Sequence, residues 1–222
     1  MSQKSFRAVG SLLAGVAVVA VVSACSESET VDPAVQRALD SVLTADDFPA
    51  GYSVVTLGKD EKKTIVDQFD DSRRDAEVTP ASCKSSHEAP SDSETGSVVA
   101  VNGQSTLSQS VSQSTESATG LIAAVSGECS KVTVKLTAGP AKGTTAVITS
   151  ADVQPATIEG FDGVTFRQVS TVDDEERQGL IGRFQVDGYL VTVQAVKADG
   201  SMPDRASFDA TVAAAVTKAA RG

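Results

Sequence analysis

The three cysteines of this chain have its most reactive side chains, and their positions point to different chemistry. Cys25 follows a hydrophobic run that ends in the small residues Ser23 and Ala24, and a polar, acidic segment begins directly after it. Cys83 and Cys129 lie in the body of the chain, and neither belongs to a CxxC pair. A thiol can be acylated, can pair with a second thiol or can bind a metal ion. An odd number of cysteines leaves one thiol without an intramolecular partner.

The segment before Cys25 has the features of a signal peptide. Lys4 and Arg7 form a short positive region, and residues 8–22 are a continuous stretch of Ala, Val, Leu, Gly and Ser. These 15 residues suit the hydrophobic region of a signal peptide and fall short of the about 20 that span a bilayer. The sequence VSAC that ends at Cys25 resembles the lipobox of bacterial lipoprotein precursors, in which an aliphatic residue and two small residues precede a cysteine.

This resemblance implies that Cys25 is a lipid attachment site. In that family the thiol receives a diacylglyceryl group, the chain is cut directly before the cysteine, and the new amino group is acylated. We therefore expect a lipoprotein signal peptide at residues 1–24, a lipidated Cys25 with a flexible tether at residues 25–32, and a single extracytoplasmic domain at residues 33–222. Two or three acyl chains would anchor it stably to the cell membrane. An ordinary secretory signal with an incidental cysteine, or an uncleaved anchor, is the alternative.

With Cys25 lipidated, Cys83 and Cys129 are the one intramolecular pair that remains. An exported compartment permits their oxidation. The disulfide would close a loop of 46 residues, which in the chain-entropy model stabilises the fold by about 4 kcal/mol. Two free buried thiols are the alternative. A metal site is disfavoured, because the single histidine, His87, lies in a Ser-rich polar stretch.

The sequence lacks catalytic motifs with the required spacing. It contains no G-x-S-x-G, P-loop, G-x-G-x-x-G or H-E-x-x-H motif. A Ser-His-Asp site would need His87 beside a serine and an acid, and we expect His87 to be a solvated loop residue. The acidic stretch VDDEERQ (172–178) could bind Ca²⁺ but has no EF-hand spacing, so we expect a solvated hairpin loop. The interpretation is a protein that is not an enzyme and uses no cofactor.

The segment LSQSVSQS (107–114) is a candidate binding surface. A strand periodicity of two places Ser108, Ser110 and Ser112 on one face. The other face carries Leu107, Gln109, Val111 and Gln113. A floor of small hydroxyls could line a cleft and hydrogen-bond a polar ligand. A solvent-facing sheet surface, or small residues that make room for a helix, are the alternatives.

The candidate residues described above would be positioned by helices and β-hairpins. Helices are expected to begin at Asp32-Pro33, at Thr79-Pro80, at Ser114 or Thr115, and near Pro203. Strands are expected in residues 52–58, 97–114, 131–137, 143–153, 163–171 and 179–197, with hairpin turns at Asn102-Gly103 and Asp187-Gly188. Residues 59–78 fit a short helix or a loop, and residues 84–96 a polar loop. The pattern predicts an α+β fold with an antiparallel sheet of about six or seven strands, helices packed on it and one disulfide.

The net charge of the chain limits the classes of partner that it can bind. The 222 residues carry a net charge of −10, and the only charges among the first 24 are Lys4 and Arg7, so the rest carries −12. Such a chain repels phosphate backbones and shows no basic patch, so we expect no nucleic-acid binding. Apolar residues make up 41% of the chain and aromatic residues only 4%, so we expect the core to rest on Val, Ala, Leu and Ile.

Two further stretches carry a second resemblance. TADDFPAGY (44–52) and TPASC (79–83), followed by a helix that ends at a cysteine, a strand-rich half and an Ala-rich final helix, resemble small envelope lipoproteins of mycobacteria and their relatives. Their domain is similar to the extracellular sensor domain of a mycobacterial receptor Ser/Thr kinase, which has two disulfides where this chain can form one. The resemblance implies an α/β sandwich with a cleft and a non-enzymatic role in sensing or binding. Its ligand would be a small molecule, a glycolipid or a cell-wall fragment. The alternative function is an interaction or structural module whose partner is another envelope protein. A hydrolase is a third and weaker alternative.

Overall fold

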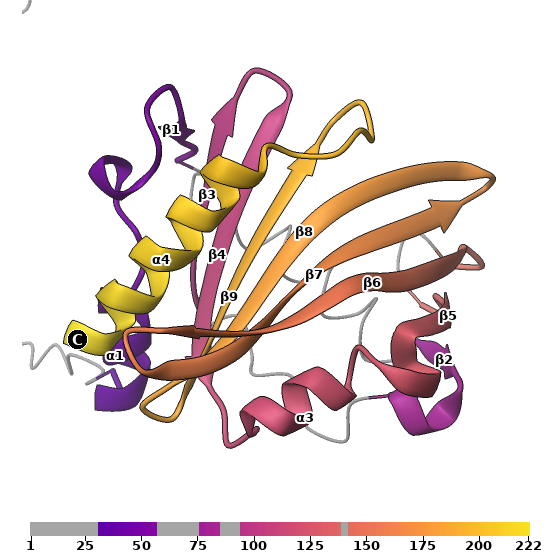
Figure 1. The fold of residues 1–222 in the computed structure, drawn as a ribbon, viewed down its shortest axis with the longest axis horizontal. Helices are drawn as coiled ribbons and strands as arrows, with labels where there is room; N and C mark the ends of the chain where they lie inside the picture. Colours follow the sequence, from indigo (N-terminus) through magenta and orange to yellow (C-terminus); the bar gives the residue numbers. More distant parts are fainter. Residues whose placement is uncertain (1–30, 57–75, 85–93, 139–141) are drawn as a thin grey trace, which may run out of the picture. The chain divides into compact units, whose positions relative to one another are not determined.

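A computed structural model describes residues 31–56, 76–84, 94–138 and 142–222 of the chain. These residues have the α+β architecture that the sequence predicts (Figure 1). The helices are α1 (Pro33–Asp40), α3 (Ala118–Ala123) and α4 (Arg205–Arg221), and short 3₁₀ helices lie at Ala45–Asp47, Ala81–Cys83 and Gly127–Ser130. In this part of the chain, no helix combines the length and hydropathy needed to cross a membrane.

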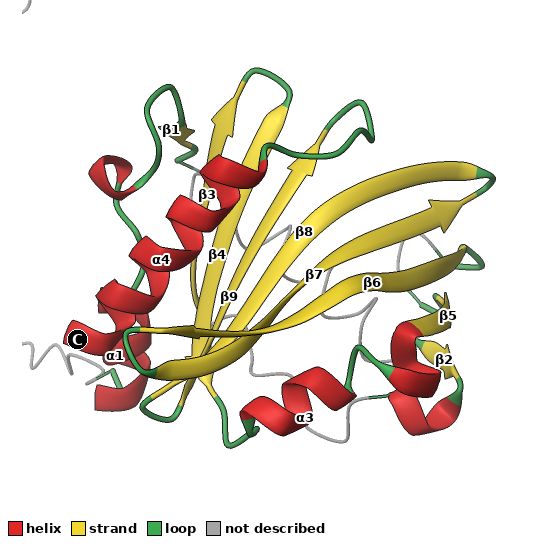
Figure 2. Ribbon diagram, in the orientation of Figure 1, coloured by secondary structure: helices red, strands yellow, loops and turns green. Residues whose placement is uncertain are grey.

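One antiparallel sheet runs through the unit Val31–Gly222 (Figure 2). Its strands are β1 (Ser53–Val54), β2 (Glu77–Thr79), β3 (Gly96–Asn102), β4 (Ser105–Gln113), β5 (Lys131–Lys135), β6 (Thr145–Ile158), β7 (Phe161–Val172), β8 (Glu175–Val186) and β9 (Tyr189–Lys197). Their order is β1-β3-β4-β9-β8-β7-β6-β5-β2. The prediction of six or seven strands was therefore too low for the described residues, which form nine. Strand β2 falls in a charged segment without strand periodicity, and its pairing with β5 holds it in the sheet.

Two-residue turns join the long strands. Asp187 and Gly188 have positive φ values of 46° and 87° between β8 and β9, which confirms the predicted hairpin. Asp173 and Asp174 make the same kind of turn between β7 and β8. The acidic stretch is therefore a hairpin, but its loop is shorter than expected, because Glu175 to Gln178 already belong to β8. The hairpin at Asn102 is also present, but its loop is shifted by one residue. Asn102 is the last residue of β3, and Gly103 and Gln104 form the turn.

Helix starts follow side-chain caps, with two corrections. Asp32 accepts a hydrogen bond from the Ala34 N–H at 2.7 Å, as Asp32-Pro33 predicts, and Asp204 caps α4 through Ser207 N–H. Helix α3 begins later than expected, because Ser117 is its cap instead of Ser114 or Thr115. Thr79 ends β2, and Pro80 precedes only a short 3₁₀ helix.

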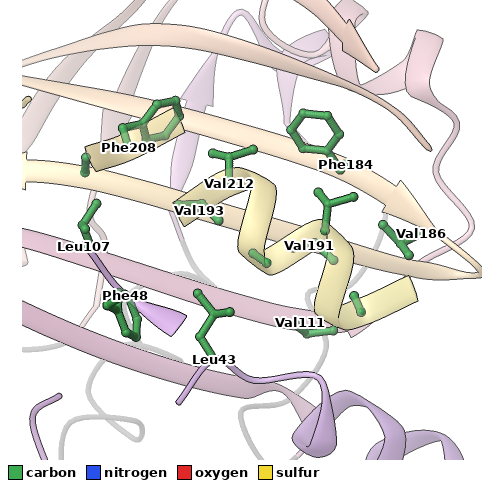
Figure 3. Packing of buried hydrophobic residues seen from close by; sticks show 14 of the residues in the cluster. Leu43, Phe48, Leu107, Val111, Phe184, Val186, Val191, Val193, Phe208 and Val212 are labelled. Atoms are coloured by element: carbon green, nitrogen blue, oxygen red, sulfur yellow. The ribbon is translucent and has the colours of Figure 1, made fainter. Parts of the chain in front are cut away.

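The main core lies between α1, α4 and one face of the sheet, which we call the helix face (Figure 3). Phe208 and Val212 of α4 contact the sheet together with the small residues Ala215 and Ala219, which let the helix lie close. A β-bulge at Asp152 interrupts the pairing of β6 with β7. Beyond the bulge, the end of β6 packs against the same core, so the sheet curves around α4 (Figure 1).

Gln109 is a polar residue inside this core and is 2% exposed. Its Oε1 accepts a hydrogen bond from the Leu43 N–H at 2.7 Å, and its Nε2 donates to the Ser41 carbonyl at 3.1 Å. Both backbone groups lie directly after α1, where the chain has left the helix. Gln109 therefore fixes the end of α1 to strand β4.

Candidate functional site

The alternation predicted for β4 is present, and it separates two faces of the sheet. Leu107, Gln109 and Val111 are buried on the helix face. Ser108, Ser110 and Ser112 are half-buried and lie on the opposite face, which we call the serine face. The sequence therefore identified the orientation of the three serines.

Strand register extends the serine positions into a row that crosses four strands. Ser110 is directly opposite Ser97 of β3 and Thr192 of β9. Thr192 is in turn opposite Arg183 of β8. We call Ser97, Ser110, Thr192 and Arg183 the polar row. Directly opposite positions in antiparallel strands share a face, so these four residues belong to one surface.

The neighbouring rows are also partly polar. Ser108 is opposite Gln194 of β9, and Ser112 is opposite Leu190. All of these side chains are half-buried. The surface around Ser110 therefore offers hydroxyl and amide groups that can both donate and accept hydrogen bonds.

Arg183 is the positive charge of the polar row. Its Cζ lies 5.8 Å from the centroid of the Phe166 ring, within the range of a cation–π contact. Burial lowers the pKa of the Arg183 guanidinium from its ordinary value, and the negative charge of Glu116 raises it in part. The group nevertheless stays charged at neutral pH, because the ordinary pKa of arginine lies far above 7.

Helix α3 covers the part of the serine face next to the polar row. Leu121 of α3 and Val125, which follows the helix, pack with Val164, Phe166 and Ile181 of β7 and β8 in a second buried cluster. This cluster borders Arg183 on the β7 side, since Val164 is its cross-strand neighbour. The guanidinium thus sits between an apolar cluster and a row of hydroxyls.

The serine face becomes apolar toward the edge of the sheet. Val99 and Val101 of β3 are each 37% exposed, and Val55, which follows β1, is 39% exposed. The Val55 N–H donates to the Val99 carbonyl at 2.9 Å, which places Val55 beside β3. Three exposed β-branched side chains thus lie at one end of the polar surface.

The predicted pairing of Cys83 with Cys129 is present as a disulfide with a Cα–Cα distance of 5.4 Å. It joins the 3₁₀ helix Ala81–Cys83 to the 3₁₀ helix Gly127–Ser130, and Ser82 Oγ donates to Glu128 Oε1 at 2.9 Å beside it. Cys83, Glu128 and Cys129 form the one group of three ligand-type side chains in the described ranges. Both sulfurs are used in the disulfide, so the group holds no free thiolate for a metal ion.

Several predicted residues remain without a structural test. Cys25 and His87 lie outside the described residues, as does most of the segment 59–78. The sequence pattern did not single out Ser97, Thr192 or Arg183 of the polar row. The signal was present in the alternation of β8, where Phe184 and Val186 face the core and the residue just before Phe184, Arg183, is charged.

Comparisons with known proteins add a structural similarity. No protein-family model matches the chain, and no curated protein matches it. The chain is similar to the X-ray structure of an uncharacterised protein from Mycobacterium smegmatis, the Rv0999 ortholog. The two have 12% sequence identity and a TM-score of 0.44, over 79% of this chain and 92% of that chain.

Proposed function

We propose that this protein is a lipid-anchored, extracytoplasmic binding protein of the cell envelope that holds a ligand on the serine face. The observation that carries the proposal is the polar row, in which three hydroxyl side chains and one guanidinium lie side by side on adjacent strands. Central strands position such groups more rigidly than loops do. A sensor-like role would follow from the same site.

The proposed location at the cell membrane is based on the sequence around Cys25. A positive region, a hydrophobic run and the VSAC sequence precede a polar segment, as in lipoprotein precursors. Helix α1 begins at Pro33, eight positions after Cys25. Eight extended residues reach at most about 28 Å, so a lipid at Cys25 would keep the folded domain close to the membrane surface.

The expected ligand is a polar small molecule, a glycolipid or a cell-wall fragment. Hydroxyl and amide side chains recognise such molecules through hydrogen bonds, and the half-burial of Ser108, Ser110 and Gln194 would strengthen these bonds relative to bulk water. A nucleic-acid partner is disfavoured by the charge of −10.

A second candidate is an interaction module for another envelope protein. The exposed side chains of Val55, Val99 and Val101 favour it, because apolar side chains gathered on one surface are typical of interfaces. This reading predicts that the valines are needed for partner binding, whereas the serines are not.

Ligand retention separates the two candidates. The protein is purified from the cells that produce it, and native mass spectrometry measures any bound molecule in the wild type, in Ser110→Val and in Ser170→Val. Ser170 is a half-buried strand serine of β7 outside the polar row, so it controls for the loss of a sheet hydroxyl. We expect a bound mass in the wild type and in Ser170→Val, with occupancy at least tenfold lower in Ser110→Val. A ligand-free wild type that retains a protein through Val99 would support the interaction module instead.

A further inference from the structure

The Arg183 guanidinium has no anionic partner within the described residues. No salt bridge or hydrogen bond joins it to another residue there, although Arg37, Arg167, Arg177 and Arg205 all have a carboxylate partner. A guanidinium has five N–H donors in a planar fork that matches a carboxylate or a phosphate. Arg183 is half-buried, and a charge that is partly withdrawn from water without a partner is unfavourable, so its presence in the sheet calls for another role.

We propose that Arg183 is the anion-recognising residue of the serine face, and that the ligand carries a carboxylate or phosphate group together with several hydroxyls. This inference rests on the proposed function and specifies the ligand class of the same site. The polar row offers a charged group for the anion and hydroxyl groups for the rest of the ligand. Arg183 binds the anion, and Thr192, Ser110 and Ser97 bind the hydroxylated body of the ligand.

The dimensions of the row support an extended ligand. Adjacent strands lie about 4.8 Å apart, so three spacings separate Arg183 from Ser97 by about 14 Å. A bare phosphate ion would occupy only the Arg183 end. A molecule of one or two sugar rings with an anionic group at one end would reach the hydroxyls as well.

The surroundings hold Arg183 in place for this role. The Phe166 ring lies against the guanidinium, and the buried cluster under α3 packs next to it on β7. The negative charge of Glu116 influences Arg183, yet within the described residues the two side chains do not form a salt bridge. The Glu116 Cγ and Oε1 lie beside Gly120 of α3, the residue four positions later. The positive charge therefore stays available to a ligand anion.

A binding titration of the full chain in a non-ionic detergent tests the inference. The probes are glucose 6-phosphate, inorganic phosphate and the soluble lipid dihexanoyl phosphatidylglycerol, with glucose as the uncharged control, and calorimetry gives each Kd. We expect an anionic probe to bind more tightly than glucose. Arg183→Met should raise the Kd of that probe at least tenfold. Arg177→Met is the control, because Arg177 is exposed on the same face of β8 and pairs only with Glu175. Preference for the sugar phosphate, the free ion or the lipid identifies the source of the anion.

Two further readouts distinguish recognition from a structural role. Arg183→Met should raise the melting temperature of the ligand-free protein, since it removes an unpaired, partly buried charge, whereas a structural arginine would lower it. Glu116→Gln should tighten binding of the anionic probe, because it removes a negative charge near Arg183. Arg183→Met with unchanged affinity and a lower melting temperature would overturn the inference.

Failure of the inference is distinguishable from failure of the proposed function. If the molecule retained from cells is uncharged and is lost in Ser110→Val but kept in Arg183→Met, the serine face binds a ligand and the anion assignment is wrong. If no probe binds and no molecule is retained, both the anion assignment and the binding function are wrong.

Discussion

Replacement of Gln109 by leucine tests how the sheet holds the end of α1. Leucine fits the volume of glutamine and suits the neighbouring apolar residues, but it has no polar atoms. The Leu43 N–H and the Ser41 carbonyl would then lose their partner at a position where both residues are at most 3% exposed. Each buried backbone group left without a hydrogen bond costs about 1–3 kcal/mol, and the apolar leucine offsets part of the sum. We expect a net loss of about 2–4 kcal/mol in the free energy of unfolding.

Urea unfolding followed by circular dichroism measures this loss. With a slope of about 2 kcal/mol per molar urea, the midpoint of Gln109→Leu should fall by about 1–2 M. Gln113→Leu is the control, because Gln113 is exposed and lies at the end of the same strand. We expect Gln113→Leu to change stability by less than about 0.5 kcal/mol. Equal midpoints for the two variants would refute the role assigned to Gln109.

Three further perturbations follow from the sequence and the structure. Cys25→Ser should release the protein from membranes, or leave it as an uncleaved precursor, without unfolding the domain; mature, cleaved protein still on the membrane would contradict the lipid anchor. Cys83→Ser should lower the free energy of unfolding by about 4 kcal/mol, since the disulfide closes a separation of 46 residues, while the protein stays on the membrane. The hydrogen bond from Lys218 at 2.8 Å lowers the pKa of Asp47 to about 2, with further hydrogen bonds from Thr44. A lowered pKa in the folded state stabilises the protein above pH 4, and this contribution is lost as the pH falls toward 2. Lys218→Met should therefore make the free energy of unfolding depend less on pH in that range. It should also lower this free energy at pH 7 by about 1 kcal/mol, after allowance for solvent screening. An unchanged pH dependence would argue against the ion pair.

The elements predicted most accurately are those that local chemistry determines. Asp32-Pro33 and Asp187-Gly188 place a helix start and a hairpin turn, because capping and positive φ depend on the residues themselves. The alternation of β4 likewise places its serines on one face. The pairing of Cys83 with Cys129 followed from the assignment of Cys25 to a lipid.

The features that the sequence did not reveal depend on long-range pairing. Strand β2 has only three residues, and it exists because β5 offers an edge to pair with. Ser117 replaces the two predicted caps of α3, a difference of two or three positions that tertiary packing decides. The polar row could not be predicted, since Ser97, Ser110, Thr192 and Arg183 come together only through the register of four strands.

A crystal structure of the protein isolated from the cells that produce it would show whether a ligand occupies the serine face. We expect electron density for a small molecule on the serine face, with an anionic group against Arg183 and hydroxyls near Ser110 and Thr192. A ligand bound elsewhere, or a partner protein seated on Val99 and Val101 with the polar row empty, would contradict this expectation.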